Sequence, residues 1–127
     1  MYSLVKAMKA LSDETRLRII NLLMERECCV CEVVQAMEIS QTRASRNLMM
    51  LYDAGFLKLK KEGLWSLYSL DKGSLPEHLV KLTESVKLAL GSNKVALADR
   101  KRLKMASRNG PSCIQKTNGV CSTSGKV

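Results

Sequence analysis

The first half of the chain repeats its apolar residues with the 3.6-residue period of an α-helix. Beyond Asp13, one face collects Leu17, Ile19, Ile20, Leu22, Leu23 and Met24. Ser12 is a plausible N-cap, because Asp13 and Glu14 follow it and suit the positive end of the helix dipole. The pattern predicts a helix that begins next to Ser12 and buries one side.

Two further helices are expected before residue 55. A short one runs from residue 29 or 30 to residue 37. Ser40 can cap a longer one, whose inward positions are Ala44, Leu48 and Leu51. Gly55 stands where a helix often ends in a left-handed residue, and apolar Phe56 follows it.

The period changes to two after Phe56. Residues 57–60 alternate leucine with lysine, Glu62-Gly63 suits a turn, and residues 65–70 form a second strand. Pro76 then suits the first turn of a last helix. One side of that helix carries Leu75, Leu79, Leu82, Val86 and Leu90.

These apolar stripes are more than one protomer of this size can cover. We expect the last helix and the N-terminal segment with Leu4, Met8 and Leu11 to form a dimer interface. The alternative is that the last helix packs only on its own domain.

Length and charge set the organisation of the chain. Its 127 residues, 46% of them hydrophobic, are enough for one domain with a core. The net charge is +9, but residues 1–91 carry 13 Lys/Arg against 11 Asp/Glu, whereas residues 92–127 carry 8 against 1. We therefore expect a nearly neutral domain over residues 1–91. A basic, flexible, cysteine-containing tail over residues 92–127 would hold at most a weak helix at 94–107.

No apolar run approaches the roughly 18–20 residues that a membrane span requires. Lys6 interrupts the start of the chain too early for a secretory signal. We expect a cytoplasmic protein without membrane contact, in which the five cysteines are reduced.

A helix, a tight turn, a capped helix and a basic hairpin follow one another in the order of a winged helix-turn-helix. The second helix of such a pair enters the major groove of DNA. Its outward residues here include types that bond to base edges or phosphates: Gln41, Thr42, Arg43, Ser45 and Arg46. Lys58, Lys60 and Lys61 on the hairpin would meet backbone phosphates.

Three cysteines lie just before this DNA-reading helix, in Cys28-Cys29-Val30-Cys31. Thiolates select soft metal ions, and a helix N-terminus lowers the pKa of a thiol. Successive helical residues turn by about 100°, so Cys29 and Cys31 should point nearly opposite ways. One ion would then bind both only if the first turn distorts and displaces the DNA-reading helix. The plain alternative is three small buried apolar residues.

Four stretches resemble the ArsR/SmtB family of metal-responsive repressors. They are ALSDETRLRI (10–19), SQTRASRNL (40–48), DAGFL (53–57) and GLWSLYSL (63–70), within a match over residues 4–90. CVCEV (29–33) is most similar to the arsenic-responsive branch and also resembles the cadmium/lead-responsive branch. Asn47 stands where the family usually has histidine, and it can still donate to phosphate or a base.

The resemblance implies a homodimer on an inverted-repeat operator, released by As(III) or Sb(III), with Cd(II) or Pb(II) as alternative inducers. As(III) takes three sulfurs, and the family's common third cysteine would fall at Val34. Cys28 is the nearest substitute for it, and Cys113 and Cys121 are the alternatives. The paired His/Asp site of the Zn/Ni sensors is not matched by the lone His78, which is interpreted as a solvated residue.

Three other functions are weighed against the same sequence features. A thiol-redox or reactive-sulfur sensor could use a Cys28–Cys31 disulfide. A thiol oxidoreductase would place its C-x-x-C after a strand, whereas helices flank this one. A structural DNA-binding protein would respond to no inducer. No catalytic triad or phosphate-binding glycine loop is found, so we do not expect an enzyme.

Overall fold

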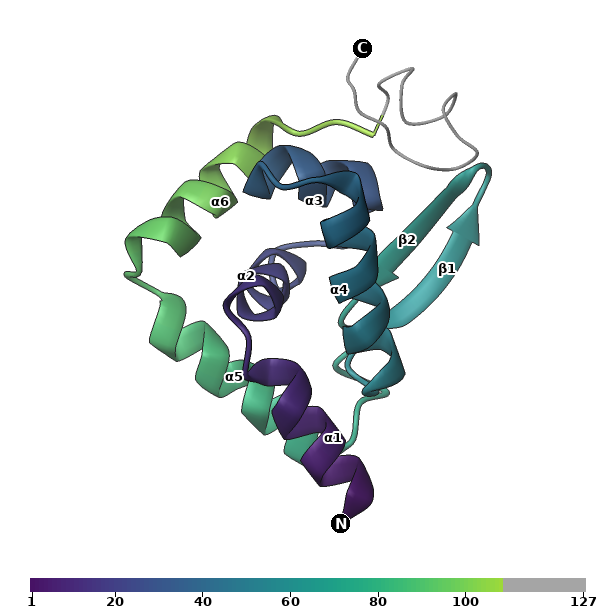
Figure 1. Cartoon of the computed structure of the whole chain (residues 1–127), viewed down its shortest axis with the longest axis vertical. Helices are drawn as coiled ribbons and strands as arrows, with labels where there is room; N and C mark the ends of the chain where they lie inside the picture. Colours follow the sequence, from purple (N-terminus) through teal and green to yellow (C-terminus); the bar gives the residue numbers. More distant parts are fainter. Residues whose placement is uncertain (109–127) are drawn as a thin grey trace.

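The computed structural model describes residues 1–108 of the chain. This part contains α1 (Tyr2–Leu11), α2 (Glu14–Leu23), α3 (Val30–Met37), α4 (Gln41–Asp53), β1 (Lys58–Glu62), β2 (Trp65–Ser69), α5 (Glu77–Leu90) and α6 (Lys94–Met105). Helix α2 lies in the middle, the other helices surround it, and the hairpin projects at one side (Figure 1). The predicted mainly α architecture with one small hairpin is therefore confirmed.

The core is built around α2, which packs against all five other helices. Its Ile19, Ile20 and Leu22 are fully buried. The helix begins one residue later than Ser12 suggested, because the carboxylate of Asp13 accepts from the Arg16 N–H at 3.1 Å and is the N-cap. Ser12 instead ends α1.

Helix α4 and the hairpin follow the predicted pattern closely. Gly55 has a φ of +93°, and the N–H groups of Gly55 and Phe56 donate to the carbonyls of Tyr52 and Leu51. This pair of bonds is a Schellman motif, which ends the helix and turns the buried Phe56 into the core. In the hairpin, β1 pairs antiparallel with β2 from Lys58–Ser69 to Glu62–Trp65.

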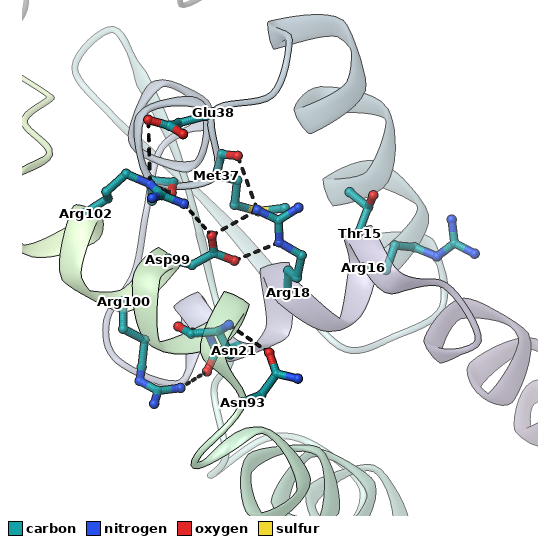
Figure 2. Close-up of polar contacts among 12 residues, drawn as sticks. Thr15, Arg16, Arg18, Asn21, Met37, Glu38, Asn93, Asp99, Arg100 and Arg102 are labelled. Atoms are coloured by element: carbon teal, nitrogen blue, oxygen red, sulfur yellow. Dashed lines mark hydrogen bonds and ion pairs between the residues drawn. The ribbon is translucent and has the colours of Figure 1, made fainter.

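The boundary predicted near Gly91 is wrong, because the chain beyond it belongs to the folded domain. Helix α6 packs against α2 and α3, and its Leu103 is a buried member of the main core. The sequence of α6 has no clean apolar stripe because polar contacts do much of the docking (Figure 2). The tail beyond Arg108, with Cys113 and Cys121, lies outside the described residues.

The two helices expected to form the dimer interface differ in how much of their apolar surface is buried. On α5, Leu79 is buried and Leu75, Leu82 and Val86 pack against the core of their own domain, as the alternative interpretation proposed. The N-terminal helix α1, in contrast, exposes Tyr2, Leu4, Val5 and Met8. Among residues 1–108, no helix has the length and apolar character needed to cross a membrane.

Candidate DNA-binding and thiol site

Helix α4 presents a polar N-terminal face to the outside. The Ser40 Oγ accepts from the Arg43 N–H at 3.1 Å and caps the helix. The inward residues are those predicted, since Ala44, Leu48 and Leu51 are fully buried. Of the predicted DNA-contacting residues, Thr42, Arg43 and Arg46 are exposed, and Gln41 and Ser45 are half-buried. The first two turns of α4 can therefore approach a nucleic-acid groove.

Two residues of this helix are tied to α2. The Arg43 guanidinium donates to the Thr15 hydroxyl at 2.7 Å. Asn47 is buried, its Oδ1 accepts from Arg16 at 2.9 Å, and its Nδ2 donates to the Arg43 carbonyl at 2.9 Å. Both ends of its amide bond to the protein, so Asn47 fixes α4 against α2, and the DNA contact expected of it stays a prediction.

The hairpin carries the predicted lysines, and two of them have acidic neighbours. Lys58 lies 3.0 Å from the Asp71 carboxylate, and this hydrogen bond is the main cause of a lowered pKa at Asp71. Lys60 lies 3.6 Å from Glu27 and 3.8 Å from Glu62. Exposed pairs of this kind contribute little stability, so both lysines can exchange these partners for phosphates. Lys61 is also exposed.

The structure brings Cys29 and Cys31 together. Both lie in a small buried cluster with Leu67 of β2, and Trp65 packs against it. The expectation that these two side chains point opposite ways applied to a regular helix. It assumed that both residues are helical, whereas Cys29 is the N-cap, with φ −88° and ψ 169°. An extended residue directs its side chain differently from a helical one, and the two cysteine side chains lie in one cluster beside an intact first turn.

Cys28 lies apart from this pair. It forms an isolated antiparallel bridge with Tyr68, with two backbone hydrogen bonds of 3.0 and 2.8 Å, and its fully buried side chain belongs to the main core. Alternation along the extended chain explains why adjacent Cys28 and Cys29 enter different clusters. Burial and the nearby Glu32 carboxylate raise the pKa of the Cys28 thiol to about 12. Cys28 is therefore better described as a small buried core residue than as a third metal ligand.

Glu32 organises the start of α3. Its carboxylate accepts from the Cys29 N–H at 2.9 Å and lies 2.7 Å from Arg26 and 3.2 Å from Arg108. The spacing of Glu32 three residues after the N-cap is that of a capping box. That spacing was visible in the sequence, but Cys29 is an unusual cap residue and the signal was missed.

Gln35, one turn after Cys31, is a second residue that the sequence did not reveal. Its Nε2 donates to the Cys31 sulfur at 3.3 Å and to the Ser107 carbonyl at 2.9 Å. Its Oε1 accepts from the Ser107 N–H at 3.1 Å. Only the tertiary structure brings Ser107 to this place, so no local pattern could have identified the pair.

A buried ion-pair cluster fixes α6 against α2 and the C-terminal end of α3 (Figure 2). The fully buried Asp99 carboxylate receives two bonds from Arg18, at 2.8 and 2.9 Å, and one from Arg102 at 2.9 Å. Arg18 also donates to the Met37 carbonyl, and Arg102 to the Ala36 carbonyl. The hydrogen bond to Asp99 raises the pKa of Arg18 above its ordinary value, although burial opposes this. The cluster joins α2, the end of α3 and α6.

Metal-ligating side chains do not form a complete site in the described part of the chain. Within residues 1–108, no group of three or more His, Cys, Asp or Glu side chains could hold a metal ion. His78 is exposed near the start of α5, as expected. The thiol site consequently offers two sulfurs from this part of the chain, those of Cys29 and Cys31.

Comparison with known proteins gives consistent relatives. The profile of the family described as "Bacterial regulatory protein, arsR family" matches residues 13–64. A cadmium resistance regulator homolog (CadC) from Staphylococcus aureus is 44% identical over 62% of this chain and 63% of its own length. The arsenical resistance operon repressor of Escherichia coli is 43% identical over 52% and 57%. The chain thus spans less than two thirds of these two relatives.

Other relatives match over most of their length. The arsenic resistance regulator ArsR2 of Pseudomonas putida is 39% identical over 72% of this chain and 76% of its own. A homodimeric winged helix-turn-helix DNA-binding domain from Mycobacterium bovis superposes with a TM-score of 0.60 and 26% identity, over 72% of this chain and 81% of that domain. On this sequence likeness and this fold, the chain belongs to the ArsR family of bacterial regulatory proteins and is not an enzyme.

Proposed function

We propose that this protein is a homodimeric, cytoplasmic transcriptional repressor that leaves its operator when Cys29 and Cys31 capture As(III) or Sb(III). The operator is double-stranded DNA with an inverted repeat, as two-fold symmetry of the dimer would require. Residues Gln41, Thr42, Arg43, Ser45 and Arg46 face the bases, and Lys58, Lys60 and Lys61 face phosphates. The proposal rests above all on the shared cluster of Cys29 and Cys31 against the wing strand β2.

The donor set fits a soft, thiophilic guest. Two cysteine sulfurs in an apolar surrounding, once both are reduced, would favour As(III), Sb(III), Cd(II) or Pb(II) over hard ions that prefer oxygen. The relatives named for arsenic and for cadmium resistance support both classes of inducer. We place As(III) and Sb(III) first and keep Cd(II) and Pb(II) as the second candidates.

The wing provides a route from the thiols to DNA. Cys29, Cys31 and Leu67 are between 1 and 7% exposed, so a guest between the sulfurs has to displace the apolar side chains of β2. The bridge from Cys28 to Tyr68 joins the same strand to the thiol segment. Binding therefore shifts β2 and its partner β1, which carries the phosphate-facing lysines. Such couplings are typically worth about 1–3 kcal/mol, or roughly 5- to 150-fold in DNA affinity.

A redox switch built on a Cys28–Cys31 disulfide has less support. Cys28 is a free thiol in the main core, and the cysteines that it would join lie in the other cluster. A Cys28–Cys31 disulfide would therefore require both clusters to open.

A release titration tests the proposal. The protein first selects its operator from random-sequence DNA, and fluorescence anisotropy then follows release by arsenite, antimonite, cadmium and lead. We expect the Cys29→Ser/Cys31→Ser protein to bind the operator as the parent does and to stay bound when arsenite is added. Cys121→Ser is the matched control and should be released normally. If the double variant still leaves the DNA, the thiol switch is wrong.

A further inference from the structure

The lysines assigned to DNA phosphates all lie on the hairpin, at one side of α4 (Figure 1). A helix in the major groove has a sugar-phosphate strand along each of its two sides, because the groove is only about 12 Å wide. Given the proposed function, on which this inference rests, the second strand runs along the side of α4 away from the hairpin. The corner between α1 and α2 borders that side.

Three contacts place α2 along this side of α4. The Arg43 guanidinium donates to the Thr15 hydroxyl at 2.7 Å. The Arg16 guanidinium donates to Asn47 Oδ1 at 2.9 Å and to Met50 Sδ at 3.4 Å. The three contacted residues of α4 follow one line along the helix, at spacings of four and three residues. The N-terminal end of α2 therefore borders the DNA-reading face over about two turns.

Arg16 also fixes α1 in this corner. Its Nε donates to the Ala10 carbonyl at 2.6 Å, and its Nη2 donates to the Lys9 carbonyl at 3.4 Å. Both carbonyls belong to the last turn of α1, so one guanidinium joins the end of α1 to α4. The Arg16 side chain is only 13% exposed. The backbone of α1 therefore has a fixed position relative to the DNA-reading helix.

Two lysines of α1 lie over the hollow that this arrangement leaves. Lys6 and Lys9 are one turn apart and, together with Arg16, line a cavity of about 220 Å³ whose other wall is the end of α4. Both lysines are exposed, and neither forms an ion pair within residues 1–108. The nearby carboxylates are Asp53, on the α4 wall, and Asp13, 3.9 Å from Arg16. The balance of charge remains positive, so the cavity favours an anion.

These lysines lie on a different side of α1 from its exposed apolar residues. Leu4, Met8 and Leu11 follow one line at spacings of four and three residues, and this is the line expected to face a second protomer. Helical residues turn by about 100°, so Lys6 is nearly opposite Met8. A partner packed on the apolar line therefore leaves Lys6 open to DNA, and Lys9 lies beside Lys6.

From this arrangement we infer that Lys6 and Lys9 form a second binding site for the phosphate backbone of duplex DNA. The wing lysines contact one strand of the major groove, and the α1 lysines contact the other. An ammonium group on a phosphate adds affinity and fixes the orientation of the protein, but it reads no base. Arg16 is a positioning residue, because it sets where α1 lies beside α4.

Salt dependence measures this site. The full-length Lys6→Gln/Lys9→Gln protein is titrated with the selected operator by fluorescence anisotropy at several salt concentrations. Each lost phosphate contact lowers the slope of log affinity against log salt by about 0.9, so we expect a slope shallower by about 2. The same relation gives an affinity lower by roughly 30-fold at 0.15 M salt, with little difference near 1 M. Affinity for random-sequence DNA should fall by the same factor.

The chain offers a charge-matched control on α6. Lys101 and Lys104 are exposed and three residues apart, like Lys6 and Lys9, but their helix packs mainly against α3 and α2. Lys101→Gln/Lys104→Gln removes the same charge and should leave the slope nearly unchanged. Lys6→Arg/Lys9→Arg keeps both charges and should bind as the parent does. An equal loss in the two glutamine variants would trace the effect to net charge and overturn the inference.

Neutral phosphates identify the contact directly. Methylphosphonate replaces the backbone phosphates of the operator one position at a time. In the parent, one or two positions should weaken binding, and in Lys6→Gln/Lys9→Gln the same positions should cost nothing further, as expected for groups in contact. If every position weakens both proteins alike, the site is wrong. A parent that binds DNA but is not released by arsenite would refute the proposed switch alone. A parent that binds no duplex DNA would refute both.

Discussion

The buried carboxylate of Asp99 offers the sharpest test of how α6 is held. We consider Asp99→Asn, which keeps the size and one acceptor but removes the charge. Asp99 is fully buried, and Arg18 and Arg102 surround it with three bonds of 2.8–2.9 Å. The Arg18 side chain is only 18% exposed, so its charge cannot simply return to water.

The expected cost follows from this geometry. Removing one partner of a buried ion pair typically costs 3–5 kcal/mol, because the other charge remains without compensation. Since asparagine retains an acceptor for one guanidinium, we expect the lower end, a loss of about 3 kcal/mol in the free energy of unfolding. For a domain of this size, that corresponds to a fall of roughly 10 °C in Tm.

Arg102→Met is the matched comparison. Arg102 is 35% exposed, so solvent partly screens its ion pair with Asp99. The Arg102→Met variant also loses one hydrogen bond to the Ala36 carbonyl. We expect a loss of about 1 kcal/mol. Both variants leave the proposed DNA and thiol residues unchanged.

The assay is urea unfolding followed by far-UV circular dichroism, at one fixed protein concentration because the stability of the proposed dimer would depend on concentration. Limited trypsin digestion adds a local readout, since Lys101 and Lys104 lie on α6. We expect Asp99→Asn to be cleaved there faster than the parent. A loss below 1 kcal/mol for Asp99→Asn, or a larger loss for Arg102→Met, would show that the cluster does not hold α6.

Three further predictions concern DNA and the core thiol. Arg46→Ala should weaken operator binding by roughly 5- to 150-fold if it meets a base, a contact worth about 1–3 kcal/mol; unchanged anisotropy titrations would contradict this. Lys61→Ala should lower the slope of log affinity against log salt concentration by about 1 while leaving sequence preference intact. Cys28, with its pKa raised from 9.0 to about 12, should resist iodoacetamide at pH 8 until the protein unfolds. Because the unfolded thiol ionises first, its contribution to stability is complete below pH 9 and is lost as pH rises toward 12, so Cys28→Ala should remove that part of an alkaline unfolding curve.

The sequence by itself determined the elements between residues 13 and 90 and their order. Period 3.6 located α2 and α4, period 2 located the hairpin, and Gly55 marked the end of α4, because these signals act between neighbours in the chain. The exposed face of α4 followed for the same reason. The family resemblance rested on these same stretches, and the relatives confirm it.

The tertiary structure alone decided which side chains meet. It assigned Asn47 to Arg16, placed Cys28 in a different cluster from Cys29, and docked α6 through Asp99 although α6 has no apolar stripe. Buried polar contacts of this kind join residues 31 to 81 positions apart. An unpaired polar group is costly when it is buried, so these groups pair with whatever partner lies beside them in the core. Burial depends on the whole fold, so a local repeat pattern in the sequence does not predict it.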